Sequence, residues 1–279
     1  MDRVRARKRT ELLRNIIQII FFFIFPSAFS SAFAAVKETA AALSQGAPLS
    51  LGPFARICLF LLAFTVIAGR FFCGYACAFG TLGDGVYMLS RSIQKKTGKK
   101  FPKIPVKAVK YLQLVKYVVL GGIFVLCFIG EQETVNRNSP WTLFSLLISL
   151  KAPSSDMIAA GILLLLTVVG MALQSRFFCQ FLCPMGALFS LMPVLPSGQL
   201  VRDSENCIHG CSICERACPA ALKLGDDDLR EGECIRCNKC LHACPRGNIK
   251  LKLSAFSPDS PAWVVIQAAV LLLVLKFVI

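Results

Sequence analysis

The sequence RFFCGYACAFG (residues 70–80) recurs as RFFCQFLCPMG (residues 176–186), and this repeat governs the interpretation of the rest of the chain. Each copy follows one apolar stretch and precedes another. Paired halves of this kind are a feature of membrane proteins, where functional sites lie at the interface between the repeats. The repeat therefore predicts a membrane protein with two pseudo-repeated halves.

Each copy carries two cysteines four residues apart, a spacing that places both on one face of a helix. Facing copies would bring together the sulfurs of Cys73, Cys77, Cys179 and Cys183. Such a group can bind a metal or iron–sulfur centre, or act as two redox dithiols. The alternative is that these small side chains only pack a tight helix interface. Because the cysteines match in two copies, a functional site is favoured; the single Cys58 and Cys127 are expected to be packing residues.

The composition agrees with a membrane protein. The 279 residues are 55% hydrophobic and 17% charged, whereas soluble domains have about 25% charged residues. The net charge is nevertheless +15. A disordered chain needs low hydrophobicity, so this class is disfavoured, and a soluble enzyme is disfavoured as well.

Five apolar stretches reach or approach the roughly 20 residues that a membrane-spanning helix needs. They are Leu12–Phe33, Pro53–Gly69, Tyr111–Ile129, Met157–Leu173 and Pro261–Ile279. Loops rich in lysine and arginine stay in the cytoplasm. Residues 1–15 carry six basic residues and residues 70–110 carry nine, whereas residues 34–52 and 130–156 carry one and two. The chain is therefore predicted to have a cytoplasmic N-terminus and five crossings, and its charge indicates topology rather than nucleic-acid binding.

Two features near the ends of apolar stretches have specific interpretations. The basic N-terminus, the apolar run Ile16–Phe25 and the small residues of 31–34 also fit a signal peptide with a cleavage site. Lys116 and Arg56 lie near helix ends, so we expect their charged groups to extend to the membrane surface.

A polar stretch, residues 202–252, interrupts the apolar pattern and contains eight cysteines. They form the runs Cys207-x3-Cys211-x2-Cys214-x3-Cys218-Pro219 and Cys234-x2-Cys237-x2-Cys240-x3-Cys244-Pro245. The second run has the spacing of bacterial ferredoxins, in which the cysteine before proline binds the cluster of the other run. We therefore predict two [4Fe-4S] clusters. One would be bound by Cys207, Cys211, Cys214 and Cys244, and the other by Cys234, Cys237, Cys240 and Cys218.

Disulfides and zinc are the alternatives for these eight cysteines. The cytoplasm keeps thiols reduced, which disfavours disulfides. Zinc sites use paired Cys-x2-Cys motifs without a trailing Cys-Pro. The first run has one extra residue between its first two cysteines, a departure from the usual ferredoxin spacing.

These patterns predict a transmembrane domain over residues 1–201, a double-cluster ferredoxin domain over 202–252 and a C-terminal transmembrane helix within 253–279. The predicted fold class is an α-helical polytopic membrane protein with about five transmembrane helices. It carries a cytoplasmic ferredoxin domain of the bacterial 2[4Fe-4S] type.

The order of the motifs resembles that of the NapH family, the quinol dehydrogenase membrane subunits associated with periplasmic nitrate reductases. It is similar to the polyferredoxin part of the NosR regulators and to the CcoG assembly proteins of cytochrome oxidase. The resemblance covers nearly the whole chain, although Ala78 stands where the family has proline. It implies a multi-pass protein of the bacterial cytoplasmic (inner) membrane, the quinone pool as electron source and other redox proteins as partners.

The leading hypothesis is therefore an electron-transfer subunit of an oxidoreductase, which passes electrons between a membrane reductant and two [4Fe-4S] clusters. One alternative is copper reduction or handling by the membrane cysteines during assembly of a respiratory enzyme, because soft thiolates suit Cu(I). The chain has only six Met and two His, fewer than expected of a metal carrier. The other alternative is a membrane anchor for a redox subunit. The glycines lack the strand that a dinucleotide-binding motif requires, so no nucleotide site is predicted.

Overall fold

The computed structural model of the chain is predominantly helical and describes residues 2–26, 28–46, 52–98, 101, 104–203, 205–220, 222, 231–252 and 260–278. Residues 253–259 and Ile279 of the predicted C-terminal segment lie outside the described residues. The long elements are α1 (Asp2–Ile24), α2 (Ala28–Ser44), α3 (Pro53–Ala68), α4 (Ala78–Thr97), α5 (Val106–Ile129), α8 (Ile158–Leu173) and α13 (Pro261–Val278). The shorter helices are η1 (Phe72–Ala76), α6 (Gln132–Arg137), α7 (Pro140–Ile148), η2 (Ser155–Met157), α9 (Phe177–Phe181), α10 (Pro184–Leu191), η3 (Pro196–Gly198), α11 (Ile213–Ala217), η4 (Glu231–Glu233) and α12 (Lys239–Ala243).

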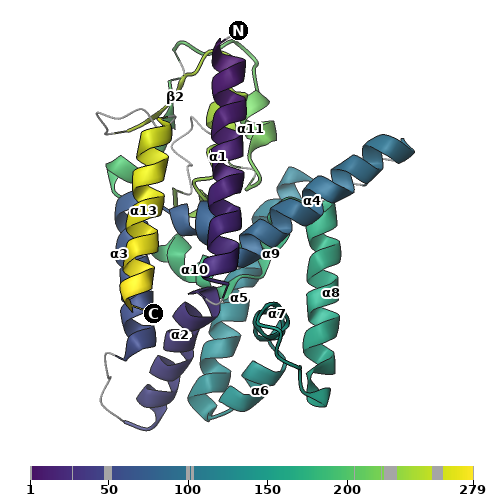
Figure 1. Cartoon of the computed structure of the whole chain (residues 1–279), viewed down its shortest axis with the longest axis vertical. Coiled ribbons are helices and arrows are strands. Elements are labelled where there is room, and N and C mark those ends of the chain that lie inside the picture. The colour runs from purple at the N-terminus through teal and green to yellow at the C-terminus, as the bar shows by residue number, and fades with distance from the viewer. Residues whose placement is uncertain are drawn as a thin grey trace.

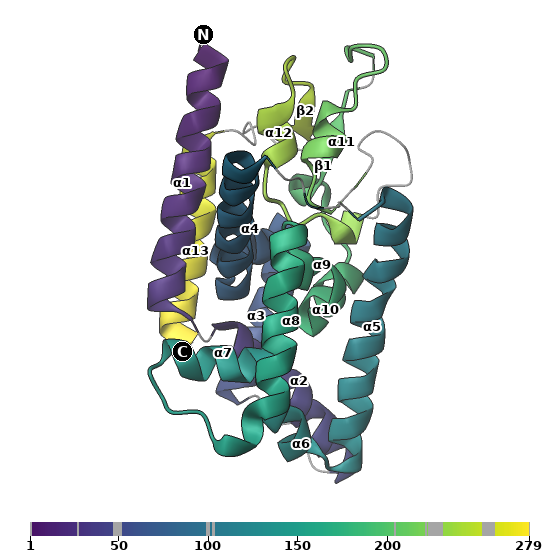
Figure 2. The ribbon, with the colours of Figure 1, turned by 90° about the vertical axis from the view of Figure 1, so that its right-hand side faces the viewer.

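The molecule has two distinct ends, joined by long helices. The N-terminus, β2 and α11 lie at one end, and α6 lies at the other (Figure 1). Figure 2 shows α5 and α8 both running lengthwise between these ends, and each of them contacts α9. The cysteine-rich region is therefore on the same side of the molecule as the N-terminus and opposite the 131–156 connection, which is the relative placement that the charge pattern predicts.

Only some of the five predicted crossings form helices that are long enough to span a membrane. Two segments, Ala108–Ile129 and Ser155–Leu173, are long and apolar enough to cross. The pair Arg9–Ile24 and Ala28–Ser44 passes the same test together but is bent by 61°, so it adds a third span if both helices form one crossing. Pro53–Ala68 and Pro261–Phe277 are shorter apolar helices. The described residues thus contain two or three candidate spans, and the predicted number of five stays a prediction.

The predicted stretch Leu12–Phe33 is not one continuous helix. Helix α1 ends at Ile24 and α2 begins at Ala28. Pro26 lies between them, and proline has no backbone N–H and clashes with the preceding helical turn. The residues around the candidate signal-peptide cleavage site lie inside α2, where Ala32 and Phe33 are fully buried.

Aromatic residues fill the centre of the helical bundle. Phe33, Phe79 and Phe178 are at most 2% exposed, and the rings of Phe79 and Phe178 stack with centroids 4.6 Å apart. In contrast, α5 and α8 direct large apolar side chains outward, as at Val118, which is 73% exposed, and Leu165, which is 64% exposed. An apolar surface of this extent is suited to lipid.

The cysteine-rich region is held together by a short two-stranded sheet. Strand β1 (Leu200–Arg202) pairs antiparallel with β2 (Ile249–Leu251), and Leu200 lies opposite Leu251. These strands enclose both cysteine runs, and their leucines pack with Cys214 and Cys240 in a small hydrophobic core. The sheet therefore brings the start and end of the predicted ferredoxin region together.

Candidate functional site

The two copies of the repeat fold alike around their second cysteine. Cys77 lies between η1 and α4, and Cys183 lies between α9 and α10. Both cysteines have an extended backbone, and the N–H of Gly186 donates to Cys183 Sγ at 3.1 Å. The expectation that each cysteine pair shares one helical face is therefore wrong, because the second cysteine caps the next helix.

The structure nevertheless brings the four cysteines of the repeat together, and we call them the membrane cysteine set. All six pairs among them are close enough to interact electrostatically. Each side chain is only 3–5% exposed. Thiol–disulfide exchange requires access for the attacking thiol, so this burial disfavours the redox-dithiol alternative. The members are Cys73, Cys77, Cys179 and Cys183.

The arginine that begins each copy reaches the other copy. Arg176 donates to the backbone carbonyl of Cys73. Arg70 packs against Gly186 and interacts with the sulfur of Cys183. Both arginines are only 1% exposed, and a buried cation requires nearby negative or polar groups. Sequence reasoning missed both residues, although their position at the start of each copy was a usable signal.

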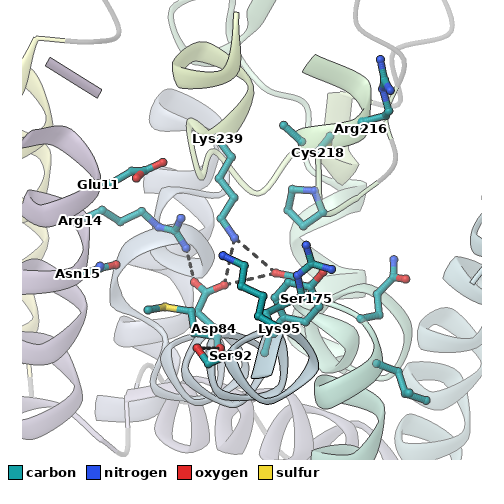
Figure 3. A pocket seen from close by; sticks show the side chains of 17 residues that line it. Glu11, Arg14, Asn15, Asp84, Ser92, Lys95, Ser175, Arg216, Cys218 and Lys239 are labelled. Atoms are coloured by element: carbon teal, nitrogen blue, oxygen red, sulfur yellow. Dashed lines mark hydrogen bonds and ion pairs between the residues drawn. The ribbon is translucent and has the colours of Figure 1, made fainter. Parts of the chain in front are cut away.

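Asp84 on α4 joins three separate regions (Figure 3). It forms ion pairs with Arg14 on α1, with Arg176 at 2.6 Å and with Lys239 on α12 at 3.4 Å. Burial raises the pKa of Asp84, but the positive charges of Arg176, Arg14 and Lys239 outweigh burial and bring the pKa well below its ordinary value. The carboxylate therefore stays ionised and links the bundle to the cysteine-rich region. It lines an open cavity of about 730 Å³ that also reaches Cys218.

One predicted ferredoxin ligand set converges across the two runs, and we call it the inner cysteine set. Its members line one small enclosed cavity, and all six pairs interact electrostatically. Cys218 thus comes from the first run and joins three cysteines of the second run, as the crossed pattern of two-cluster ferredoxins requires. The members are Cys218, Cys234, Cys237 and Cys240.

The other predicted ligands form the outer cysteine set, which consists of Cys207, Cys211, Cys214 and Cys244. Arg202 donates to Cys207 Sγ at 3.1 Å and also interacts with Cys214. Cys214 and Cys244 share the small core beneath the sheet. The N–H of Cys211 donates to the carbonyl of Ile208. The four cysteines of the outer set therefore converge less completely than those of the inner set.

The spacing within these sets allows a test of the predicted cofactor. Among the described residues, no three His, Cys, Asp or Glu side chains are placed to hold a single metal ion. Four thiolates on one zinc ion would each lie about 2.3 Å from it. A four-iron cubane is wider than one ion, and its assignment to these cysteines stays a prediction.

The inner set lies directly on the first copy of the repeat. Ile235 and Cys237 belong to the same hydrophobic core as the membrane cysteine set. The backbone carbonyl of Ile235 packs so closely on Gly74 that a Cβ there would lie 2.5 Å from it. Asn238 donates to the hydroxyl of Tyr75 at 3.1 Å. One cysteine of the predicted ferredoxin domain, Cys237, thus shares a packed core with the predicted transmembrane domain.

A buried ion pair between α5 and the residue before Cys234 also holds the inner cysteine set against the helical bundle. Lys116 is fully buried and pairs with Glu233, which immediately precedes Cys234. Tyr117 donates to the same carboxylate at 3.1 Å, and Arg70 lies 3.6 Å from it. The expectation that Lys116 extends to the membrane surface is therefore wrong; Arg56, in contrast, is exposed.

Comparison with known proteins places these features in a wider context. A family profile described as "4Fe-4S binding domain" matches residues 52–97 and 157–200, the two regions that contain the repeat. The uncharacterized protein MJ0749 of Methanocaldococcus jannaschii is 31% identical over 260 residues, 92% of each chain. The putative electron transport protein YccM of Escherichia coli is 26% identical over 67% of this chain and 53% of its own length. The regulatory protein NosR of Stutzerimonas stutzeri is 23% identical over 65% and 24%, respectively. No solved structure matches.

The fold and its cysteines define a class of protein, a helical membrane protein with 4Fe-4S binding motifs. The chain belongs to the family of membrane ferredoxin-type proteins that includes MJ0749, YccM and NosR. The family resemblance that the motif order indicates is thereby confirmed.

Proposed function

We propose that this chain transfers electrons from quinol in the membrane, through the membrane cysteine set, to the inner and then the outer cysteine set. A partner redox protein would receive them from the outer set. The observation that carries the proposal is the shared hydrophobic core of the membrane set with Ile235 and Cys237. This contact allows electron transfer between the two sets without any rearrangement of the chain.

The proposal assigns one [4Fe-4S] cluster to each ferredoxin set and a further iron–sulfur centre to the membrane set. Such centres supply one-electron chemistry with potentials set by ligands, hydrogen bonds and solvent exposure. Oxidation of one quinol releases two protons and two electrons, enough to reduce the inner and outer clusters once each. Arg70 and Arg176 would balance the negative charge of the four membrane thiolates, which water does not reach. The family match across both copies supports this assignment.

The proposed orientation is multi-pass, with the N-terminus and the ferredoxin region in the cytoplasm. The lysine and arginine bias supports it, and so does the position of both regions at one end of the molecule (Figure 1). An impermeant thiol reagent applied to intact cells should label Asn138→Cys but not Ser92→Cys. Labelling of Ser92→Cys alone would reverse the orientation.

The function is tested with anaerobically purified protein in lipid nanodiscs. About eight iron and eight sulfide per chain are expected from the two ferredoxin clusters, with further iron from the membrane set. Added quinol should bleach the visible absorbance of the wild type. Cys179→Ser should keep the eight ferredoxin irons but respond to dithionite only, because a hydroxyl is a poor substitute for a thiolate ligand.

Cys58→Ser is the matched control, because it changes a buried cysteine outside the three sets. It should behave as the wild type does. Full quinol-dependent bleaching in a variant with all four membrane cysteines changed to serine would overturn the proposed path. An iron content near zero with stoichiometric zinc would overturn the cofactor assignment.

A further inference from the structure

An apolar cavity of about 270 Å³ lies directly beside the second copy of the repeat. Residues of α5, α6, α7, α8 and α9 line it, together with Asn138 and Ser139 between α6 and α7. Leu126 and Leu163 line it and are 42% and 45% exposed on the outer surface of these helices. The cavity therefore lies where a molecule dissolved in the lipid can enter it, and its volume is suited to a single small ring system.

The wall nearest the centre of the protein is formed by Phe178 and Leu182. These residues immediately precede Cys179 and Cys183 in the chain. Phe178 is 1% exposed and stacks on Phe79 of the first copy. An occupant of the cavity would thus contact residues that are the chain neighbours of two members of the membrane cysteine set.

One residue that lines the cavity, Trp141, has an unused hydrogen-bond donor. The indole Nε1 of Trp141 is buried and has no hydrogen-bond partner within the described part of the chain. The ring is held in place by Phe33, whose ring lies edge-on to it with centroids 5.4 Å apart. A buried donor without a partner destabilises the protein, so a ligand with an oxygen acceptor would remove this cost. The apolar lining and this donor together select a lipid-soluble ring that bears a carbonyl or hydroxyl oxygen.

The other large cavities are less suited to such a molecule. The apolar cavity between α1 and α4 includes Thr81, whose hydroxyl already donates to the carbonyl of Cys77. The cavity beside Asp84 is lined by charged side chains such as Arg14 and Lys239 (Figure 3). Of these three cavities, the one at Trp141 combines exposed apolar helices, a lining residue with an unpaired donor and contact with residues next to the membrane cysteines.

We propose that this cavity binds the ring of a quinone or quinol and that Trp141 Nε1–H donates to one of its oxygens. The inference rests on the proposed function for the identity of the ligand as a redox-active ring. It adds the location of the site and the residue that recognises the ring. Both redox forms carry an oxygen at the ring, so the same hydrogen bond serves substrate and product.

The chain has two tryptophans, which provides a direct binding assay. Trp263→Phe leaves Trp141 as the only tryptophan, and Trp141→Phe leaves only Trp263 on α13; excitation at a wavelength that tyrosine does not absorb isolates their emission. In nanodiscs, a short-chain naphthoquinone should quench the emission of the Trp263→Phe variant along a saturable curve. The Trp141→Phe variant should show only the linear quenching of a quinone dissolved in lipid. Linear quenching in both variants, or saturation in both, would overturn the proposed site.

Kinetics separate this inference from the proposed function. Trp141→Phe should raise the KM for quinol about tenfold, the equivalent of one lost hydrogen bond, while its iron content and reduction by dithionite stay unchanged. Leu163→Phe, which narrows the cavity from α8, should weaken saturable quenching in the Trp263→Phe background and provides a second variant if Trp141→Phe does not fold.

Saturable quenching without quinol-dependent bleaching would contradict the proposed function alone. Quinol-dependent bleaching with an unchanged KM in both variants would contradict the cavity alone.

Discussion

The inner and outer cysteine sets have nearly the same ligand pattern but very different surroundings. In the inner set, Cys237 and Cys240 are 8% exposed, and the loop between Cys234 and Cys237 packs on the repeat. Around the outer set, Ile208 and Ile213 are 45% and 42% exposed. Two similar motifs thus differ in what packs against them. In the proposed function, the buried inner set would receive electrons and the more exposed outer set would deliver them.

Loss of one ligand from each set should give the largest contrast. Cys237→Ser should remove about four of the eight ferredoxin irons and largely abolish reduction of the remaining cluster by quinol. Cys207→Ser should remove a similar amount of iron but leave the inner cluster reducible by quinol. Iron analysis and electron paramagnetic resonance after quinol addition distinguish the two. Equal quinol reduction in both variants would contradict the order of the two sets.

The buried ion pair beside the inner set gives the next largest effect. Lys116→Met leaves Glu233 buried without its main partner, so we expect a loss of about 3–5 kcal/mol in stability. Thermal loss of the visible absorbance measures it. The double variant Lys116→Met/Glu233→Gln should recover most of the loss.

The outer set supplies the matched control for this pair. Glu215 lies 3.7 Å from Arg202, and its side chain is 32% exposed. Glu215→Gln should therefore cost at most about 1 kcal/mol. A cost as large as that of Lys116→Met would show that burial is not what distinguishes the two sets.

A methyl group added at Gly74, where the repeat contacts the loop between Cys234 and Cys237, should have a smaller effect. Gly74→Ala places a Cβ against the carbonyl of Ile235, which should cost about 1–3 kcal/mol and slow electron transfer to the inner set. Gly210→Ala in the outer loop meets no neighbouring atom but has a φ of +71°, so it should cost about 1 kcal/mol without changing that rate. Stopped-flow bleaching with quinol measures both; equal rates would argue against close contact at Gly74.

The smallest expected effect comes from a single hydrogen bond. Tyr75→Phe removes the acceptor of Asn238 but keeps the ring stacked on Phe71, with centroids 4.3 Å apart in the wild type. The expected loss is about 0.5–1.5 kcal/mol. Tyr111→Phe, at a side chain that is 75% exposed, should change nothing. A greater loss at Tyr111 than at Tyr75 in thermal unfolding would contradict this ranking.

Local spacing indicated one group of cysteines that the structure brings together, whereas cluster binding by these residues stays a prediction. The Cys-x2-Cys-x2-Cys run and the Cys-Pro of the other run indicate that Cys218 joins Cys234, Cys237 and Cys240, and the structure gathers these four. The repeat likewise predicts that four membrane cysteines meet, although the reason from helical spacing was wrong, because Cys77 and Cys183 cap new helices. Pro26 was a local signal for the break between α1 and α2 that the hydropathy pattern concealed.

Long-range charge pairing could not be predicted in this way. Lys116 and Glu233 are 117 positions apart, and no pattern within either segment indicates the other. The same holds for Asp84, which forms ion pairs with basic residues of α1, of the second copy of the repeat and of α12. Such partners follow from the packing of the helices, and that packing depends on the whole chain.

The pairing of Lys116 with Glu233 also determines the kind of carrier that this protein is. Movement of the ferredoxin region away from α5 would leave an ammonium group in an apolar environment, at a cost of several kcal/mol per uncompensated ion. A swinging domain that shuttles between donor and acceptor is therefore disfavoured. In the proposed function the ferredoxin region would therefore stay in place during transfer. The internal transfer rate should then be independent of solvent viscosity, and only the arrival of the partner at the outer set should depend on diffusion.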